Sequence, residues 1–358
     1  MINPAMITLM REARGWTQKD LAGAIQIAQG TLSKYELGLL QVPDSDIEAI
    51  TSALVFDRTL LDEFVPLLGL GGDFLYRRRA NVPAKDKRRV QAEANLIRIQ
   101  TERLLRRAEY ECDLHFPAIQ PEEFNGRIES IAAEVRSAWR IPHGPIRNLT
   151  RVVESAGGLV FALDFGTPLI DGTNIRVPGT PPLLFLNRDV PGERHRFNLA
   201  HEIGHAVMHF STSLGDPEEE ANRFASELLM PKSQIRSDLR NLDLPAAQRL
   251  KGVWGVSMAA IIRRARQLGQ ISESTYRRMF TALSARGHRT VEPLPLEFEK
   301  PEVFERLKDF HRTQLGFSED DLCRLLYTDR LGRIDVHRVP RLRLKTPGLF
   351  DRGPAAEA

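Results

Sequence analysis

The sequence is poor in cysteine and contains no long apolar run. Two of its 358 residues are cysteines, Cys112 and Cys323, which are too few for a disulfide framework. No apolar stretch approaches the ~20 residues that cross a bilayer, which argues against an integral membrane protein. The first residues lack the basic start and apolar core of a signal peptide. We therefore expect a cytoplasmic protein with reduced thiols and no membrane partner.

The net charge of +3 is too small to indicate a partner, but the charge is unevenly distributed. Between residues 77 and 107, eleven Lys and Arg stand against three Asp and Glu. Pro83 suits the first turn of a helix that continues to Arg107 or beyond. A basic helix of this kind either supplies charge for nucleic-acid phosphates or presents a solvated face. The sequence leaves both interpretations open.

The apolar pattern predicts an α+β protein that is mostly helical. Helical spacing dominates residues 120–155, 194–230 and 245–286. Short apolar runs at 158–163 and 182–187 are bounded by Gly and Pro and predict strands of a small sheet, the second of them at an edge. The residues of 245–286 that we expect in the core are Leu250, Val253, Val256, Met258, Ile261, Ile262, Ala265 and Leu268.

Residues 6–39 predict three short helices. Gly15 ends the first helix, and Thr17 with Asp20 three residues later has the pattern of a capping box at the start of the second. The third helix begins at Gln29, whose amide can bond an adenine edge. The side chains expected to face DNA bases or phosphates on this helix are Gln29, Gly30, Thr31, Ser33 and Lys34.

This N-terminal segment, over about residues 5–65, resembles the XRE (phage-repressor-like) helix-turn-helix family. The residues that carry the resemblance are Thr17-Gln18, Leu21-Ala22 and Thr31-Leu32-Ser33-Lys34-Tyr35-Glu36-x-Gly38. The resemblance implies that Gln18 contacts the DNA backbone and that Gln29 belongs to a helix that reads the major groove of a double-stranded operator. A homodimer on a two-fold operator is a further expectation. The alternative is a small helical domain used only for dimerisation.

A His-Glu-x-x-His pattern lies in the second helical region. His201 and His205 are four residues apart, so on a helix their imidazoles project from one face about one turn apart. This spacing suits two nitrogen ligands of one tetrahedral zinc ion. Glu202 would lie beside the metal without binding it, where it can accept a proton from water. Gly204 permits another element to approach closely, and the alternative is a surface helix with two histidines.

The segment 216–231 predicts a following helix that supplies a third ligand. Glu218 and Asn222 share one helix face with two alanines, so this helix can pack closely against the first. Glu218 then points at the metal, and Asn222 orients a ligand. Glu219 and Glu220 are expected to be solvated, but either remains an alternative ligand because the phase of a helix start is uncertain.

Residues from about 145 to 285 resemble the ImmA/IrrE family of metallopeptidases. The motifs that carry the resemblance are Arg196-Phe197-x-Leu199-Ala200-His201-Glu202-Ile203-Gly204-His205, Glu218-x-x-Ala221-Asn222-x-Phe224-Ala225 and Leu228-Leu229-Met230-Pro231. The resemblance implies a small zincin-like peptidase whose zinc ligands are two histidines and a later glutamate. It also implies cleavage of a repressor-type protein, which switches on stress or mobile-element genes.

A peptidase of this kind needs a donor for the oxygen that becomes negative during the reaction. Arg194, His195 and His209 are close enough in sequence to be considered, although a structural or surface role is the preferred interpretation of each. The strand at 183–187 is expected to hold an extended substrate by strand addition.

The sequence thus predicts four parts. They are a helix-turn-helix domain (1–72), a basic helical connector (73–118), a zincin-like metallopeptidase domain with a small sheet (119–290), and a helical C-terminal region of unassigned role (291–358) whose tail after Pro340 we expect to be partly disordered. The predicted function is a DNA-binding regulator with a zinc endopeptidase that cleaves a partner repressor or itself. The alternative is a transcription factor whose zincin-like domain is a sensor or dimerisation module with little or no proteolysis.

Overall fold

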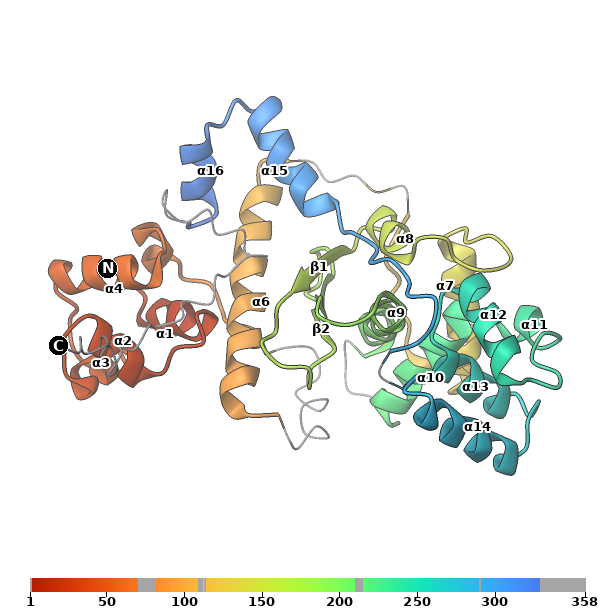
Figure 1. Ribbon diagram of the computed structural model, residues 1–358. Helices are drawn as coiled ribbons and strands as arrows, with labels where there is room; N and C mark the ends of the chain where they lie inside the picture. The colour runs from red at the N-terminus through yellow and green to blue at the C-terminus, as the bar shows by residue number, and fades with distance from the viewer. Residues whose placement is uncertain are drawn as a thin grey trace, which may run out of the picture.

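The chain is mostly helical with one small sheet, which confirms the predicted α+β class (Figure 1). The computed structural model describes residues 2–69, 82–108, 112, 114–209, 215–289 and 291–328. Arg77-Arg78-Arg79 and the tail after Pro340 lie outside the described residues. Each helix in the described part of the chain is too short or too polar to cross a membrane.

The N-terminal unit is a bundle of short helices. Its elements are α1 (Pro4–Ala13), α2 (Gln18–Ala24), α3 (Gln29–Glu36), α4 (Asp44–Leu54) and the 3-10 helix η1 (Arg58–Asp62). The predicted capping box begins α2, since the Thr17 hydroxyl accepts from the Asp20 amide and the Asp20 carboxylate accepts from the Thr17 amide. Leu32 and Tyr35 of α3 are buried, which leaves the opposite face of α3 open.

Helix α6 (Ala84–Leu105) begins directly after Pro83 and ends two residues before the predicted Arg107. Leu96 and Ile99 pack into the core of the N-terminal bundle, whereas Ile97 and Leu104 pack into a second core beneath the sheet. Figure 1 shows α6 between the N-terminal helices and the sheet. The middle part of α6 is therefore buried and contributes side chains to two cores. For this reason α6 is not a solvent-exposed connector along its whole length.

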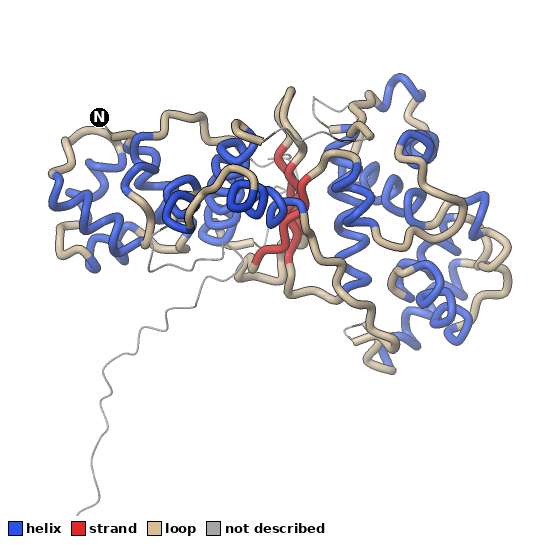
Figure 2. Tube along the Cα trace, turned by 90° about the horizontal axis from the view of Figure 1, so that it is seen from above, coloured by secondary structure: helices blue, strands red, loops and turns tan. Residues whose placement is uncertain are grey.

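The sheet has three strands in the order β1-β3-β2. β1 (Leu159–Leu163) pairs with β3 (Leu183–Asn187) in parallel, and β2 (Gly172–Ile175) pairs with β3 in the antiparallel direction. Both predicted strands are present, but the prediction that 182–187 is an edge strand is wrong. Because β3 is the central strand and is hydrogen-bonded on both sides, it has no free edge for a substrate. Figure 2 shows the strands between two groups of helices.

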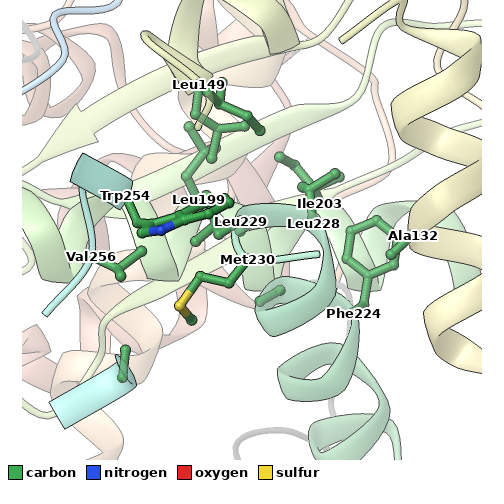
Figure 3. Packing of buried hydrophobic residues seen from close by; sticks show 14 of the residues in the cluster. Ala132, Leu149, Leu199, Ile203, Phe224, Leu228, Leu229, Met230, Trp254 and Val256 are labelled. Atoms are coloured by element: carbon green, nitrogen blue, oxygen red, sulfur yellow. The ribbon is translucent and has the colours of Figure 1, made fainter. Parts of the chain in front are cut away.

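The largest helical region is formed by elements that precede the sheet in the sequence and elements that follow it. Those that precede the sheet are η2 (Pro121–Phe124), α7 (Ile128–Ala138) and α8 (Leu149–Ser155), and those that follow it are α9 (Gly192–Met208), α10 (Pro217–Leu229), α11 (Lys232–Ile235), α12 (Leu244–Trp254), α13 (Met258–Gln267) and α14 (Glu273–Ala285). Helix α9 contacts β2 and β3 on one side and α8 and α10 on others. Figure 3 shows Leu199 and Ile203 of α9 in one apolar cluster with Phe224 of α10.

One predicted core residue of this region is misplaced. Val253 is 57% exposed, because α12 turns Ala247 and Trp254 inward instead.

The C-terminal segment returns to the beginning of the chain. Helices α15 (Val303–Thr313) and α16 (Glu319–Leu325) contact α6, and α15 also contacts β1. Tyr327 is completely buried in the core of the N-terminal bundle. Thr328 forms an isolated antiparallel bridge with Phe56. This segment therefore joins the two halves of the molecule.

Candidate metal centre and nucleic-acid interface

Helices α9 and α10 bring three potential metal ligands together. His201 and His205 lie on α9, Glu218 lies in the first turn of α10, and their ligand atoms are all within 4.8 Å of one another. The close approach expected at Gly204 explains this geometry. A Cβ atom on Gly204 would lie 3.1 Å from the Phe224 ring, so the glycine lets α10 lie directly against α9.

The distances within this group suit a tetrahedral metal ion. The Nε2 atoms of the two histidines are 3.0 Å apart, and Oε1 of Glu218 lies 3.7 Å from His201 Nε2 and 3.3 Å from His205 Nε2. Ligands at about 2.0–2.2 Å from a tetrahedral zinc ion are separated by roughly 3.3–3.6 Å, and the three observed separations bracket this range. Two imidazole nitrogens and one carboxylate oxygen also form a donor set that zinc accepts, with a fourth position left for water or substrate.

The second nitrogen of each histidine ring is held by another side chain. His201 Nδ1 is 3.2 Å from Oδ1 of Asn222, the residue expected to orient a ligand. His205 Nδ1 is 2.8 Å from Nδ1 of His209, and His209 Nε2 is 2.8 Å from a carboxylate oxygen of Glu220. The expectation that Glu220 is solvated is therefore wrong. The recurrence of histidine every four residues, at 201 and 205 in α9 and at 209 directly after it, was the one sequence signal for this chain of contacts.

Glu202 is held beside the metal group without belonging to it. Its side chain is buried, and the Asn174 amide donates a 2.8 Å hydrogen bond to Oε2. A Cβ atom on Gly172 would lie 3.0 Å from Oε1, so the backbone of β2 lies directly against this carboxylate. Asn174 and Gly172 could not be identified from the sequence, because the short polar strand β2 carries no apolar run.

The electrostatics of the group favour binding of a cation. Burial lowers the pKa of His205 to about 4, and the neighbouring imidazoles act in the same direction. Burial also acts to lower the pKa of His201, but the contact with Glu218 and the charge of Glu202 outweigh it and raise that pKa. Burial alone would raise the pKa of Glu218, yet its hydrogen bonds to the two imidazoles hold it well below the usual range. Glu218 is thus anionic and His205 neutral at pH 7, as metal binding requires, whereas a metal ion competes with a proton at His201.

A cavity of about 870 Å³ opens between this group and helices α13 and α14. His201, Glu202 and Glu218 all line it. Of the three sequence candidates for an oxyanion donor, Arg194 lines the cavity and forms a 2.7 Å ion pair with Asp171.

The other two candidates lie elsewhere. His195 is buried edge-on against Phe298, and burial lowers its pKa to about 4. His209 is engaged by His205 and Glu220, as described above.

The predicted DNA-facing residues lie along α2 and α3. Gly30 and Lys34 are exposed, and Thr31 and Ser33 are half-buried. Gln29 donates a long 3.4 Å hydrogen bond to Gln18.

A buried ion pair supports this surface from beneath. Gln18 donates to Glu36 at 2.9 Å, and Arg11 holds both carboxylate oxygens of Glu36 at 2.5 and 2.9 Å. Glu36 belongs to the motif that carries the family resemblance, whereas Arg11 was not singled out in the sequence; together they fix the position of the side chain that begins α2.

The first two turns of α6 add positive charge beside this surface. Lys85 and Arg88 are exposed and line a small cavity together with Gln18 and Gln29. Arg88 also lies 3.4 Å from a carboxylate oxygen of Glu12. Arg98 and Arg103, further along α6, are engaged by Glu102 and Glu63. Within the described residues, only the start of the basic segment therefore presents exposed positive charge beside the helix-turn-helix surface.

Two family models match the chain. Residues 7–64 match a model described as a helix-turn-helix domain, and residues 153–266 match the peptidase M78 model, described as an IrrE N-terminal-like domain. No curated protein matches the chain. Both resemblances drawn from the motifs are thereby confirmed. The chain combines a helix-turn-helix DNA-binding domain with a metallopeptidase-like domain that contains the candidate metal group.

Proposed function

We propose that this chain is a cytoplasmic transcriptional regulator that joins an operator-binding domain to a zinc-dependent endopeptidase. One observation carries the peptidase assignment: the ligand atoms of His201, His205 and Glu218 lie 3.0–3.7 Å apart beside the buried carboxylate of Glu202, at the wall of a large cavity. The resemblance of both modules to known families supports a repressor-type substrate. That substrate is a partner protein or the chain itself, in a stress or mobile-element response.

The site residues divide the work of peptide hydrolysis. Zinc bound by His201, His205 and Glu218 would supply a Lewis acid that polarises the scissile carbonyl and lowers the pKa of water. Glu202 accepts the proton of the attacking water and then delivers it to the leaving amine. The Asn174 amide orients this carboxylate. Arg194, at the cavity wall, is the candidate donor to the carbonyl oxygen as it becomes negative.

The Glu202→Gln variant tests the enzymatic role. It removes the proton acceptor but leaves the three ligands, so we expect one zinc per chain and unchanged DNA binding. Cleavage of the chain or of a co-expressed repressor should fall by about 10²–10⁴-fold. Metal analysis and mass spectrometry of the cleavage products measure both quantities.

Glu219→Gln is the matched control, because Glu219 is an exposed carboxylate on α10. Regulation that survives in Glu202→Gln would instead support a sensor domain without proteolysis. A chain that binds no zinc, or that keeps its zinc in a His201→Ala/His205→Ala variant, would contradict the metal site.

The DNA-binding surface is tested by separating phosphate contacts from base contacts. We propose that Lys85 and Arg88 contact phosphates, so alanine at both positions should reduce the slope of log K against log salt by about 0.9 for each phosphate that is no longer neutralised. We expect Gln29→Ala to relax the sequence preference without changing that slope.

Fluorescence anisotropy with a duplex selected from a random pool measures both effects. Lys232→Ala, an exposed lysine of α11, is the control. Equal slopes for the wild type and the Lys85/Arg88 double variant would exclude this role of α6.

A further inference from the structure

Two arginines line the side of the cavity that is formed by α13, by α14 and by the residues that follow α14. Arg263 lies on α13, and Arg289 follows the end of α14. Both line the cavity, and both guanidinium groups lie over the ring of Phe280, at 5.6 and 5.9 Å from its centre. Because both guanidinium groups stack on the same ring, the two positive charges are held close to each other although they come from different segments of the chain.

These arginines differ from the other charged groups that line the cavity. Arg194 is paired with Asp171, and Glu193 and Glu292 share the buried ammonium group of Lys251 at 2.6 and 3.1 Å. The carboxylates of Glu202 and Glu218 are engaged by Asn174 and by the two histidines. Arg263 and Arg289 form no ion pair with any carboxylate of the described residues. The cavity therefore has two exposed positive charges that the described part of the protein does not balance.

We propose that Arg263, Phe280 and Arg289 form a subsite that selects an acidic side chain of the peptide bound in this cavity. This inference rests on the proposed peptidase function, because the cavity also contains the metal group. A guanidinium group presents two parallel N–H donors to a carboxylate, and the ring of Phe280 limits its rotation. A lysine or arginine of the peptide would meet two like charges at the same place.

Peptide binding to the inactive Glu202→Gln chain tests the subsite without relying on catalysis. The probes are two fluorescein-labelled decapeptide pools that differ only in having Asp and Glu, or Asn and Gln, at the varied positions. In fluorescence anisotropy with one equivalent of zinc, we expect the acidic pool to bind about three- to tenfold more tightly, which corresponds to two partly exposed ion pairs. Arg263→Gln/Arg289→Gln should abolish this preference.

Arg277→Gln is the matched control, because Arg277 is exposed on α14 and pairs with Glu273 outside the cavity. The control should keep the preference for the acidic pool. Equal binding of the two pools, or a preference that survives the double substitution, would overturn the subsite. A labelled decanucleotide that binds more tightly than the acidic pool, and loses that affinity in the double variant, would replace it with a nucleic-acid site.

The same experiments distinguish a failure of the proposed subsite from a failure of the proposed peptidase function. If the wild-type chain cleaves no member of either pool, while the inactive chain binds the acidic pool through the two arginines, the peptidase assignment fails and the peptide-binding cleft remains.

Discussion

Among single residues, His195 shows how burial sets a protonation state. Its ring is 1% exposed, neither ring nitrogen has a hydrogen-bond partner among the described residues, and burial lowers its pKa from 6.5 to about 4. Between these two values the unfolded chain binds a proton that the native chain excludes. The native state is therefore favoured above pH 6.5 and loses this contribution as the pH falls toward 4.

The His195→Leu variant should lack this acid sensitivity. Between pH 7.5 and 5.0, the free energy of unfolding of the wild type should fall by about 2 kcal/mol more than that of the variant, since about 1.5 pKa units separate 6.5 from 5.0. Urea unfolding in the presence of a chelator measures the difference without a contribution from metal release. Parallel pH dependences of the two proteins would contradict a neutral buried imidazole.

The residues of the candidate site were accessible from the sequence to different degrees. The places of His201, Glu202 and His205 follow from helical periodicity alone, because α9 is long and its opposite face is apolar. Asn174 was inaccessible, because its role depends on the pairing of β2 with β3 and on the packing of α9 against that strand. Long-range contacts of this kind leave no periodic signal.

Among the secondary-structure elements, α9 and α10 determine the metal group through their contact. A methyl group at position 204 would press on Phe224 and on the backbone of Ala221, at 3.1 and 3.3 Å. We expect Gly204→Ala to move α10 outward and carry Glu218 away from the histidines. Zinc affinity should fall at least about tenfold, and stability should fall by about 1–3 kcal/mol.

Gly252→Ala provides the control for this prediction. A Cβ atom there meets nothing within 4 Å, so the substitution should keep zinc affinity and slightly raise helix stability. Competition with a zinc-binding dye measures the affinity of both variants. Unchanged affinity in Gly204→Ala would show that the spacing of the two helices does not control the ligand geometry.

The order of the strands is a second property of the elements, and the sequence did not determine it. The apolar runs identified β1 and β3, but β2 has the residues Gly172-Thr173-Asn174-Ile175 and resembles a turn. Because the sequence pattern did not predict β2, it placed β3 at the edge of the sheet. The pairing on both sides of β3 leaves β1 and β2 as the outer strands of this sheet.

Across the full length of the described chain, one helix belongs to two cores. Leu96 of α6 is buried against the N-terminal bundle, and the neighbouring Ile97 is buried against the sheet. Tyr327 strengthens this connection, because its ring enters the N-terminal core and its hydroxyl hydrogen-bonds to Glu63. No pattern in the sequence pointed to this arrangement, since the segment 291–328 carries no motif and Glu63 lies 264 residues before Tyr327.

A shared helix predicts that the DNA-binding and peptidase-like parts unfold together. Leu96→Ala and Ile97→Ala each remove a buried aliphatic side chain from a different core, at a cost of about 2–5 kcal/mol. If α6 couples the cores, each variant should lower the midpoint of a single unfolding transition, whether it is followed at a fluorophore on the bundle or at Trp254. Separate transitions, with Leu96→Ala affecting the bundle alone, would show that the two domains are only tethered. In that case, no rigid element would connect the peptidase cavity to the DNA-binding surface, so substrate binding could not change DNA binding through α6.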